Sequence, residues 1–520
     1  MKRHSCKLIY IYLALYFIIN LLFLGRFPFV HSDESWLSGL TCAIMDEGPA
    51  ATEPFFDLMP RHPHAIKLLF HLLQVPFIAL GGYALIPVRL LSLMAGTVAL
   101  YFMYRLSITL TGSTGRALLM TALLSVDVQF VYAAHFARQE ILLVAVMLAA
   151  LDFLYRNANG WRAAHDRMLG LLVGLSAGIH PNALLVALAV GGACLYLWAV
   201  ERKLRPRNLL RLGAISAACA ALFAGASLLM DPNFTRHYIA YGSELGVSRS
   251  LGDKLTGLLP YYRKLFRGIS VTYYTPPIRI ALIMFGIAAA ASLVVSVFRR
   301  QALRFLVPAL ALHAGIMLIG RYSQPAVVFT FPLGYLLIQD ILSQPVRDGS
   351  RAAPAAALAV WALPAILCGA MLVNTALAVR PYLGDEYDRY EAAISQAVPD
   401  GARSLANLNA AFALGAENML DYRNLSYLDA AGESFREYIS RNGIQYIVYP
   451  EEMDFIYENR PVWNILYGNV YPYYQSMREF LSESCDMVAQ FESPYAMRIV
   501  RYARDDDWSV RVYRVSEALP

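Results

Sequence analysis

The stretch Phe29-Val30-His31-Ser32-Asp33-Glu34-Ser35-Trp36 follows directly after the first long apolar run of the chain, which extends from about Leu8 to Leu24. Two adjacent carboxylates are costly at a membrane boundary, so Asp33 and Glu34 indicate a functional site. A carboxylate at that depth can face water on one side and a lipid-borne molecule on the other, where it could accept a proton from a hydroxyl group. The alternative is a solvated loop acid that only marks where a helix leaves the bilayer.

Composition places the chain in the membrane. The 520 residues are 58% hydrophobic and 16% charged, with a mean hydropathy of +0.44. Soluble domains carry about 25% charged residues, and many runs here reach the roughly 20 apolar residues that cross a hydrocarbon core as a helix. The composition therefore predicts a polytopic α-helical membrane protein. Its net charge of +6 is a signal of membrane topology and gives no reason to expect nucleic-acid binding.

Long apolar runs divide most of the chain into segments that could each cross a bilayer. We predict about eleven spans, with the basic start Lys2-Arg3-His4 in the cytoplasm and no cleavage site for a signal peptidase. The expected spans lie at about 8–25, 86–108, 117–135, 140–157, 168–182, 183–200, 209–230, 278–298, 303–320, 326–343 and 353–378. This arrangement obeys the positive-inside rule, except that the outer loop 231–277 carries several Lys and Arg residues.

The apolar run 65–82 has a polar face. Lys67, His71 and Gln74 recur at intervals of four and three, so they share one side of a helix. This pattern predicts an amphipathic helix that lies in the outer interface. A short, tilted span is the alternative, but it would place the later basic loops outside.

The composition changes after about Arg380. Residues 381–520 are charged, rich in tyrosine and without a long apolar run. We predict strands at Ser404–Leu408, Gln445–Tyr449, Met487–Phe491, Met497–Tyr502 and Val510–Val515, and helices at Asp385–Ala397 and Glu433–Arg441. The sequence thus predicts a membrane domain at 1–380, with outer loops 27–85 and 231–277, followed by an extracytoplasmic α/β domain at 381–520.

Several short motifs follow one another in order through residues 1–340. They are Asp33-Glu34, Arg61-His62-Pro63-His64-Ala65-Ile66-Lys67-Leu68-Leu69, His135-Phe136-Ala137-Arg138-Gln139-Glu140, Asp231-Pro232-Asn233-Phe234 with His237-Tyr238, and Gly320-Arg321-Tyr322-Ser323-Gln324-Pro325. This ordered set resembles the GT-C glycosyltransferases, in particular the protein O-mannosyltransferases and the bacterial lipid A aminoarabinose transferase. His64 stands where the mannosyltransferases carry a second proline.

The resemblance implies a multi-pass glycosyltransferase of the bacterial inner membrane, with a cytoplasmic N-terminus and a periplasmic C-terminal domain. Such an enzyme takes a monosaccharide from a polyprenyl phosphate in the bilayer and passes it to a hydroxyl group of a protein, lipid A or a glycan. The phosphate leaves as a stable anion, so one carboxylate base and cations around the phosphate are sufficient. Direct displacement inverts the anomeric carbon, whereas glycoside hydrolysis needs two carboxylates.

The same resemblance assigns roles to individual residues. Asp33 matches the catalytic aspartate and is the expected base, with Glu34 as its partner. Contacts to the donor phosphate are expected of Arg138, Arg321, Tyr322, Lys67, Arg263 and Lys264. Acceptor binding or orientation is expected of His62, Glu140 and His237. The structural alternatives are a carboxylate that favours a helix N-terminus, for Glu140, and basic side chains that extend to the head groups, for the arginines.

A divalent ion, Mg, Mn or Zn, is the one cofactor that the resemblance allows, in a Lewis-acid role near the donor phosphate. The candidate ligands are Glu53, Asp57 and Glu244. Glu244 stands where the aminoarabinose transferase has a histidine, and a carboxylate oxygen suits Mg or Mn better than Zn. The six cysteines are scattered and show no CxxC spacing.

Two other functions remain open. A lipid or solute transporter could use the same carboxylates to relay protons or bind cations, although the acidic residues here gather at the outer ends of spans. A transferase or ligase could instead move a whole oligosaccharide from a lipid diphosphate. The sequence decides neither the sugar nor the acceptor.

Overall fold

The computed structural model describes residues 2–244, 246–269, 273–347, 353–384, 386–497 and 508–516. The chain divides into two compact units. The helical unit comprises Met1–Leu24, His64–Phe70 and Arg89–Pro381, and the mixed unit comprises Gly25–Pro63, His71–Val88 and Tyr382–Pro520. The loop after the first helix thus belongs to the same unit as the C-terminal residues.

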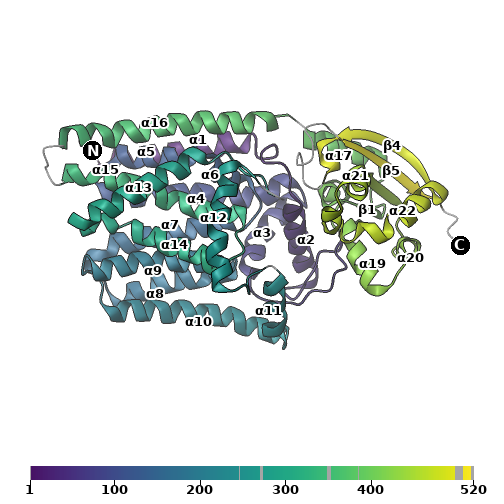
Figure 1. Ribbon diagram of the computed structural model, residues 1–520, viewed down its shortest axis with the longest axis horizontal. Coiled ribbons are helices and arrows are strands. Elements are labelled where there is room, and N and C mark those ends of the chain that lie inside the picture. The colour runs from purple at the N-terminus through teal and green to yellow at the C-terminus, as the bar shows by residue number, and fades with distance from the viewer. Residues whose placement is uncertain are drawn as a thin grey trace. The chain divides into compact units, whose positions relative to one another are not determined.

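The helical unit is a bundle of helices joined by short loops (Figure 1). Its elements are α1 (Lys2–Leu21), α4 (Leu85–Thr111, which begins in the mixed unit), α5 (Thr114–Ser125), α6 (Val128–His135), α7 (Glu140–Asn157), η1 (Ala158–Gly160), α8 (Ala163–Leu175), η2 (Ser176–Gly178), α9 (Ala183–Ala199), α10 (Pro206–Met230), α11 (Phe234–Glu244), α12 (Leu251–Arg267), α13 (Arg279–Phe298), η3 (Arg300–Leu303), α14 (Leu306–Ile319), η4 (Gln324–Phe329), α15 (Thr330–Arg347) and α16 (Ala353–Val379).

Seven helices of the described residues are long and apolar enough to cross a membrane, and the bent pair α5–α6 raises the number to eight. The predicted spans at the N-terminus and at 183–200 are shorter apolar helices, Lys7–Leu21 and Ala183–Ala199. The predicted span 168–182 is wrong in extent, because α8 ends at Leu175 and a 3-10 turn follows.

The span predicted at 117–135 breaks in its middle. The helices α5 and α6 meet at an angle of 67°. Asp127 is the N-cap of α6, where its carboxylate accepts from the backbone N–H groups of Gln129 and Phe130. Tyr335 donates to the other carboxylate oxygen at 2.5 Å. The break is therefore stabilised by a buried acid that satisfies the helix end.

Small residues set the close packing of the bundle. α8 packs on α10 and α9 packs on α14. A Cβ atom on Gly174 would lie 2.6 Å from Cys219 Cβ, and one on Gly192 would lie 3.0 Å from the backbone of Pro308. Glycine at these contacts lets helix backbones approach each other, as is common where helices associate in membranes.

The mixed unit contains a five-stranded sheet of order β2-β1-β3-β5-β4. Its elements are α2 (Ser32–Glu47), α3 (Leu68–Gly81, which begins in the helical unit), η5 (Arg380–Tyr382), α17 (Glu386–Ala397), β1 (Ser404–Ala406), η6 (Leu408–Ala410), α18 (Ala411–Leu414), β2 (Met419–Asp421), η7 (Tyr422–Asn424), α19 (Leu425–Ala431), α20 (Phe435–Arg441), β3 (Tyr446–Pro450), α21 (Glu452–Asn459), η8 (Pro461–Tyr467), α22 (Val470–Ser484), β4 (Cys485–Ser493), η9 (Pro494–Ala496) and β5 (Trp508–Val515).

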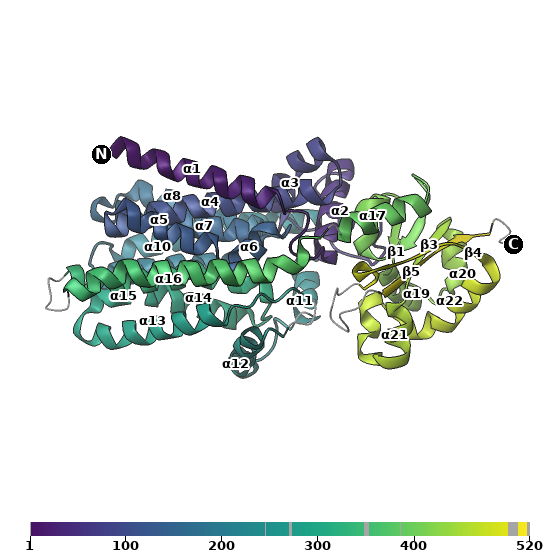
Figure 2. The same ribbon diagram turned by 90° about the horizontal axis from the view of Figure 1, so that it is seen from above.

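Strands β2, β1 and β3 are parallel, and β5 pairs antiparallel with β3 and β4. Within this unit, α17 lies on one side of the sheet and α19, α21 and α22 lie on the other (Figure 2). Buried aromatic and aliphatic side chains such as Tyr438, Tyr449 and Phe480 fill the second interface. The predicted strands at 404–408, 445–449, 487–491 and 510–515 are present. The strand predicted at Met497–Tyr502 lies, except for Met497, outside the described residues. Strand β2 was not predicted because three residues are too few for an alternating pattern.

Helix α3 carries two of the three residues of the predicted polar face, His71 and Gln74, whereas Lys67 lies before the helix with φ 85°. Thr41 of α2 donates to Gln74 Oε1 at 2.6 Å and lies 2.8 Å from His71 Nδ1. All three side chains are buried, whereas Leu73 and Leu80 are exposed. The polar side of α3 thus packs on α2, and the apolar residues Leu73 and Leu80 are exposed on its other side.

Candidate functional site

Charged and polar side chains from three segments of the helical unit line one cavity, which we name the Arg138 cavity. Its polar lining residues are Arg138, Glu140, His180, Asn182, Arg321, Tyr322 and Ser323. They come from the start of α7, from the loop before α9 and from the segment after α14. Four apolar residues complete the lining: Leu185, Ile316, Ile319 and Ala326.

Arg138 and Glu140 form a buried ion pair within this cavity. The guanidinium Nη2 lies 3.1 Å from Glu140 Oε1 and Nε lies 3.3 Å from Oε2. Nη1 of Arg138 donates to Tyr273 Oη at 2.6 Å, and the guanidinium stacks over the rings of Tyr273 and Phe136. Glu140 is the first residue of α7, where the helix dipole favours a carboxylate. Arg138 is therefore oriented by three neighbours.

Arg321 differs from Arg138 in its surroundings. Its side chain is exposed, and it makes no hydrogen bond or ion pair within the described part of the chain. A guanidinium at a cavity wall that forms no ion pair with a carboxylate is suited to bind a doubly charged phosphate group.

His180 lies at the base of the loop His180-Pro181-Asn182. The backbone N–H of Asn182 donates to His180 Nδ1 at 3.0 Å. Burial lowers the pKa of His180 well below its ordinary value, and the positive charges of Lys67, Arg138 and Arg321 lower it further. His180 is therefore neutral at pH 7, and Lys67 belongs to the same group of cations.

Lys67 and the cavity residue Tyr322 have left-handed backbone conformations. Lys67 has φ 85° and Tyr322 has φ 50°. Side chains with a Cβ atom rarely adopt such angles, and strain of this kind occurs at functional sites. Tyr322 is held by α12, because its hydroxyl donates to the Lys254 carbonyl and its ring packs on Gly257.

The other two predicted phosphate ligands lie elsewhere. Arg263 and Lys264 are exposed on α12 and are absent from the lining of the Arg138 cavity. Exposed Leu251, Leu255 and Leu259 occupy a neighbouring face of the same helix. Basic and apolar faces side by side are typical of a helix at a bilayer surface.

Asp33 and Glu34 lie in the first turn of α2 in the mixed unit. The Asp33 backbone N–H donates to His31 Nδ1 at 3.0 Å, and Glu34 Oε2 accepts from the His31 backbone N–H at 3.0 Å. This is a capping box, and Glu34 is fully buried in it. The Asp33 side chain is 36% exposed. The two neighbouring acids therefore differ: Glu34 stabilises the helix start, whereas Asp33 remains accessible.

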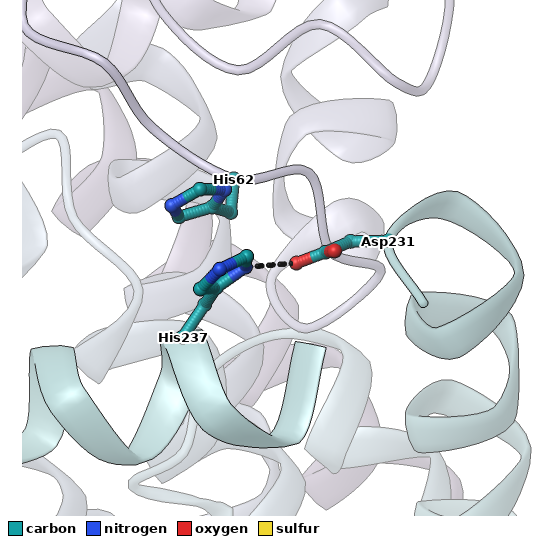
Figure 3. A group of neighbouring side chains, drawn as sticks. All are labelled: His62, Asp231 and His237. Carbon is teal, nitrogen blue, oxygen red and sulfur yellow. Dashed lines mark hydrogen bonds and ion pairs between the residues drawn. The ribbon is translucent and has the colours of Figure 1, made fainter. Parts of the chain in front are cut away.

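Asp231 and His237 form a close pair in the helical unit (Figure 3). His237 Nδ1 lies 2.6 Å from Asp231 Oδ2, and both residues frame the start of α11. His62, which Figure 3 also labels, belongs to the mixed unit. One imidazole nitrogen and one carboxylate oxygen are ligand types that bind Zn, Mn or Mg.

The predicted metal ligands have other neighbours. Asp57 accepts from Trp36 Nε1 at 2.8 Å and from Arg61 at 2.7 Å. Burial raises the pKa of Asp57, but the charge and hydrogen bonds of Arg61 and Trp36 outweigh that effect and lower it overall. Glu53 accepts from the Thr52 hydroxyl, and Glu244 is exposed at the last residue of α11. The Asp57 carboxylate is thus already paired with the guanidinium of Arg61.

Comparisons with solved structures identify the fold. The crystal structure of ArnT from Cupriavidus metallidurans bound to undecaprenyl phosphate matches with a TM-score of 0.53 and 12% identity over 97% of each chain. ArnT from the same organism in the apo state matches with a TM-score of 0.54 and 13% identity over 98% of each chain. The chain has the ArnT fold. No protein-family model and no curated protein matches it.

The ArnT fold confirms the predicted fold class, a GT-C helical membrane unit with a C-terminal α/β part. The resemblance drawn from the ordered motifs pointed to this same fold, although so few residues are identical. Within this ArnT fold the motifs around Arg138 and Arg321 converge on one cavity.

Four polar lining or supporting residues were missed as phosphate-site candidates: His180, Asn182, Tyr273 and Ser323. The tripeptide His180-Pro181-Asn182 before an apolar run is a detectable signal, since polar groups there begin a helix. Tyr273 gives no such signal because it comes from a distant loop. Among the polar lining residues, all except the carboxylate Glu140 carry a hydrogen-bond donor, so the arrangement is suited to an anion with several oxygens.

Proposed function

We propose that this protein transfers a monosaccharide from a polyprenyl-phosphate donor to a hydroxyl acceptor on the outer side of the bacterial inner membrane. The observation that carries the proposal is the Arg138 cavity, which gathers Arg138, His180 and Arg321 in a chain with the ArnT fold. The ArnT structure bound to undecaprenyl phosphate supports the same class of lipid donor.

In this mechanism the donor phosphate occupies the Arg138 cavity. Arg321 and Lys67 supply charge, and Arg138 supplies oriented N–H groups from its pair with Glu140. Preorganised cations of this kind stabilise negative charge as it develops on the leaving phosphate. No general acid is required, because the phosphate departs as an anion.

The acceptor hydroxyl attacks the anomeric carbon and loses its proton to Asp33. The exposure of Asp33 at a helix start keeps its carboxylate accessible, and a carboxylate within hydrogen-bond reach can act as general base. Attack opposite the leaving phosphate inverts the anomeric configuration. The acceptor is a hydroxyl of a protein, lipid A or a glycan, and His62 and His237 are proposed to orient it.

A divalent ion would supply Lewis-acid stabilisation of phosphate oxygens. Asp231 and His237 are the ligand types that would hold it, and their 2.6 Å contact places a nitrogen and an oxygen together. Metal content of the purified protein tests this role. Loss of bound Zn or Mn on Asp231→Ala and His237→Ala is the expected result, and equal metal content in all three proteins would exclude it.

Transfer from a panel of radiolabelled polyprenyl-phosphate sugars into membrane acceptors tests the function. We expect label with the wild type and a loss of at least about a hundredfold with Asp33→Asn, as is typical when a general base is removed. Asp400→Asn is the matched control, because Asp400 is exposed in a turn.

Wild-type transfer by Asp33→Asn at equal protein level would exclude Asp33 as the base. Label from no monosaccharide donor, with folded protein, would favour a lipid-diphosphate oligosaccharide donor. Failure of both donor classes would favour a transporter.

A further inference from the structure

We propose that His180 binds the lipid donor by donating a hydrogen bond from Nε2 to its phosphate. This inference rests on the proposed function, since it concerns the same donor. It assigns a ligand contact to a histidine that lines the Arg138 cavity together with Arg138 and Arg321.

The tautomer of His180 follows from one backbone contact. A backbone N–H can only donate, so His180 Nδ1 must accept the hydrogen bond from Asn182 at 3.0 Å. A neutral imidazole carries one N–H, which is then on Nε2. Pro181 restricts the backbone of His180 before it, which helps to keep the ring in place.

Nε2 has no hydrogen bond to any residue in the described part of the chain, although only 9% of His180 is exposed. Nε2 itself is not fully buried and keeps some accessible surface, so a ligand can reach it. Here one nitrogen bonds the backbone and the other is available at the cavity wall.

The charges around the ring favour a neutral donor. Lys67, Arg138 and Arg321 all act on His180, and Glu140 is engaged by Arg138. Burial and these cations lower the pKa of His180, so the ring stays uncharged at pH 7. A neutral N–H adds a hydrogen bond to the phosphate without adding repulsion among the three cations.

Binding of undecaprenyl phosphate to the purified full-length protein in detergent tests the proposal. His180→Gln keeps an N–H group near the position of Nε2, whereas His180→Asn keeps an acceptor near Nδ1 and loses the donor. We expect a Kd within about threefold of wild type for Gln and at least about tenfold weaker for Asn, as for loss of a hydrogen bond to a charged group.

His165→Asn is the control. His165 also accepts a backbone N–H at Nδ1, from Arg162 at 3.1 Å, but it does not line the Arg138 cavity. We expect wild-type affinity from this variant. Equal binding by His180→Asn and wild type, or equal loss with Gln and Asn, would overturn the inference.

A second measurement uses the wild type alone, in case a variant does not fold. In protein with 15N-labelled histidine, undecaprenyl phosphate is expected to shift the Nε2–H resonance of His180 downfield. An unchanged resonance at saturating lipid overturns the inference while leaving the proposed function intact. If the wild type binds no undecaprenyl phosphate at all, the donor assignment in the proposed function fails as well.

Discussion

Arg138 and Glu140 depend on each other because both are buried. Each guanidinium–carboxylate contact is short, and few water molecules can reach either group. A buried charge that loses its partner costs about 3–5 kcal/mol, whereas replacing both charges by apolar groups is often close to neutral. The Arg138–Glu140 ion pair therefore stabilises the fold and also lines the cavity.

We expect Arg138→Leu and Glu140→Leu each to lower the free energy of unfolding by about 3 kcal/mol, and the double variant to lose much less than the sum of the two. Thermal unfolding in detergent measures all three. Additive losses would mean that the two side chains are not coupled. The single variants should also transfer no sugar, because each disrupts the donor cavity.

At the scale of elements, α12 holds Tyr322 at the cavity. Lys254 Nζ donates to the Leu318 carbonyl at 2.6 Å, and Tyr261 donates to the Ser323 carbonyl at 3.1 Å. Gly257 faces the Tyr322 ring so closely that an added Cβ atom would lie 2.7 Å from it. The helix thus positions the segment after α14 through both backbone bonds and a glycine contact.

Gly257→Ala is expected to lower the free energy of unfolding by about 1–3 kcal/mol, because the new methyl group must displace Tyr322. Gly252→Ala in the same helix is the control. Its Cβ atom would lie 3.8 Å from Ser250 Oγ, so stability should stay equal or rise by up to about 1 kcal/mol. Thermal unfolding distinguishes the two, and identical shifts would contradict a specific contact with Tyr322.

Helix α17 carries a pH-sensitive carboxyl group. Burial and the charge of Asp388 raise the pKa of Glu391 to about 7, although a hydrogen bond with Tyr387 lowers it in part. In the unfolded chain this carboxyl ionises near pH 4.3. The folded state therefore holds its proton more tightly, and the contribution of Glu391 to stability is lost as the pH rises from about 4.3 to 7.

The Tm difference between pH 5 and pH 8 measures that loss. We expect Glu391→Gln to be less destabilised by the higher pH than the wild type, because glutamine does not ionise. Glu479→Gln, at an exposed position of α22, should behave as the wild type does. A pH profile unaffected by Glu391→Gln would show that the carboxyl titrates alike in both states.

At the scale of the whole molecule, distant parts of the chain form one folding unit. The loop around Phe56 bonds to the C-terminal sheet region: the Phe56 carbonyl accepts from Asp421 N at 3.0 Å and from Asn424 Nδ2 at 3.1 Å. Asn424 Oδ1 accepts from Leu58 N at 2.9 Å. The loop after the first helix is therefore held by residues more than 360 positions away along the chain.

Asn424→Ala leaves the Leu58 N–H without its acceptor, which costs about 1–3 kcal/mol when the group stays buried. We expect faster amide hydrogen exchange in residues 54–59 and unchanged exchange in the helical unit. Asn424→Asp keeps the acceptor and should protect Leu58 better than alanine does. Uniform exchange across both units would contradict local docking of the loop.

The amino-acid sequence by itself determined the helical membrane class, most span positions, the polar face of α3 and the late α/β region. These properties depend on contiguous hydrophobicity and on the period of apolar residues. Both can be read from a short stretch of sequence, without knowing which residues it contacts in the fold. The ordered motifs also identified the GT-C fold, which the ArnT structures confirm.

Only the tertiary structure decided which motif residues share a cavity. Arg138, His180 and Arg321 come together because α9 packs on both α7 and α14, with Gly192 and Gly315 at the α9–α14 contact. Such packing depends on interhelical shape that no local pattern records. The tertiary structure also decided the different surroundings of Asp33 and Glu34. It likewise decided that the loop after the first helix packs with the C-terminal sheet. Burial and hydrogen-bond partners are properties of the folded chain, so two adjacent carboxylates with the same local sequence can have different roles.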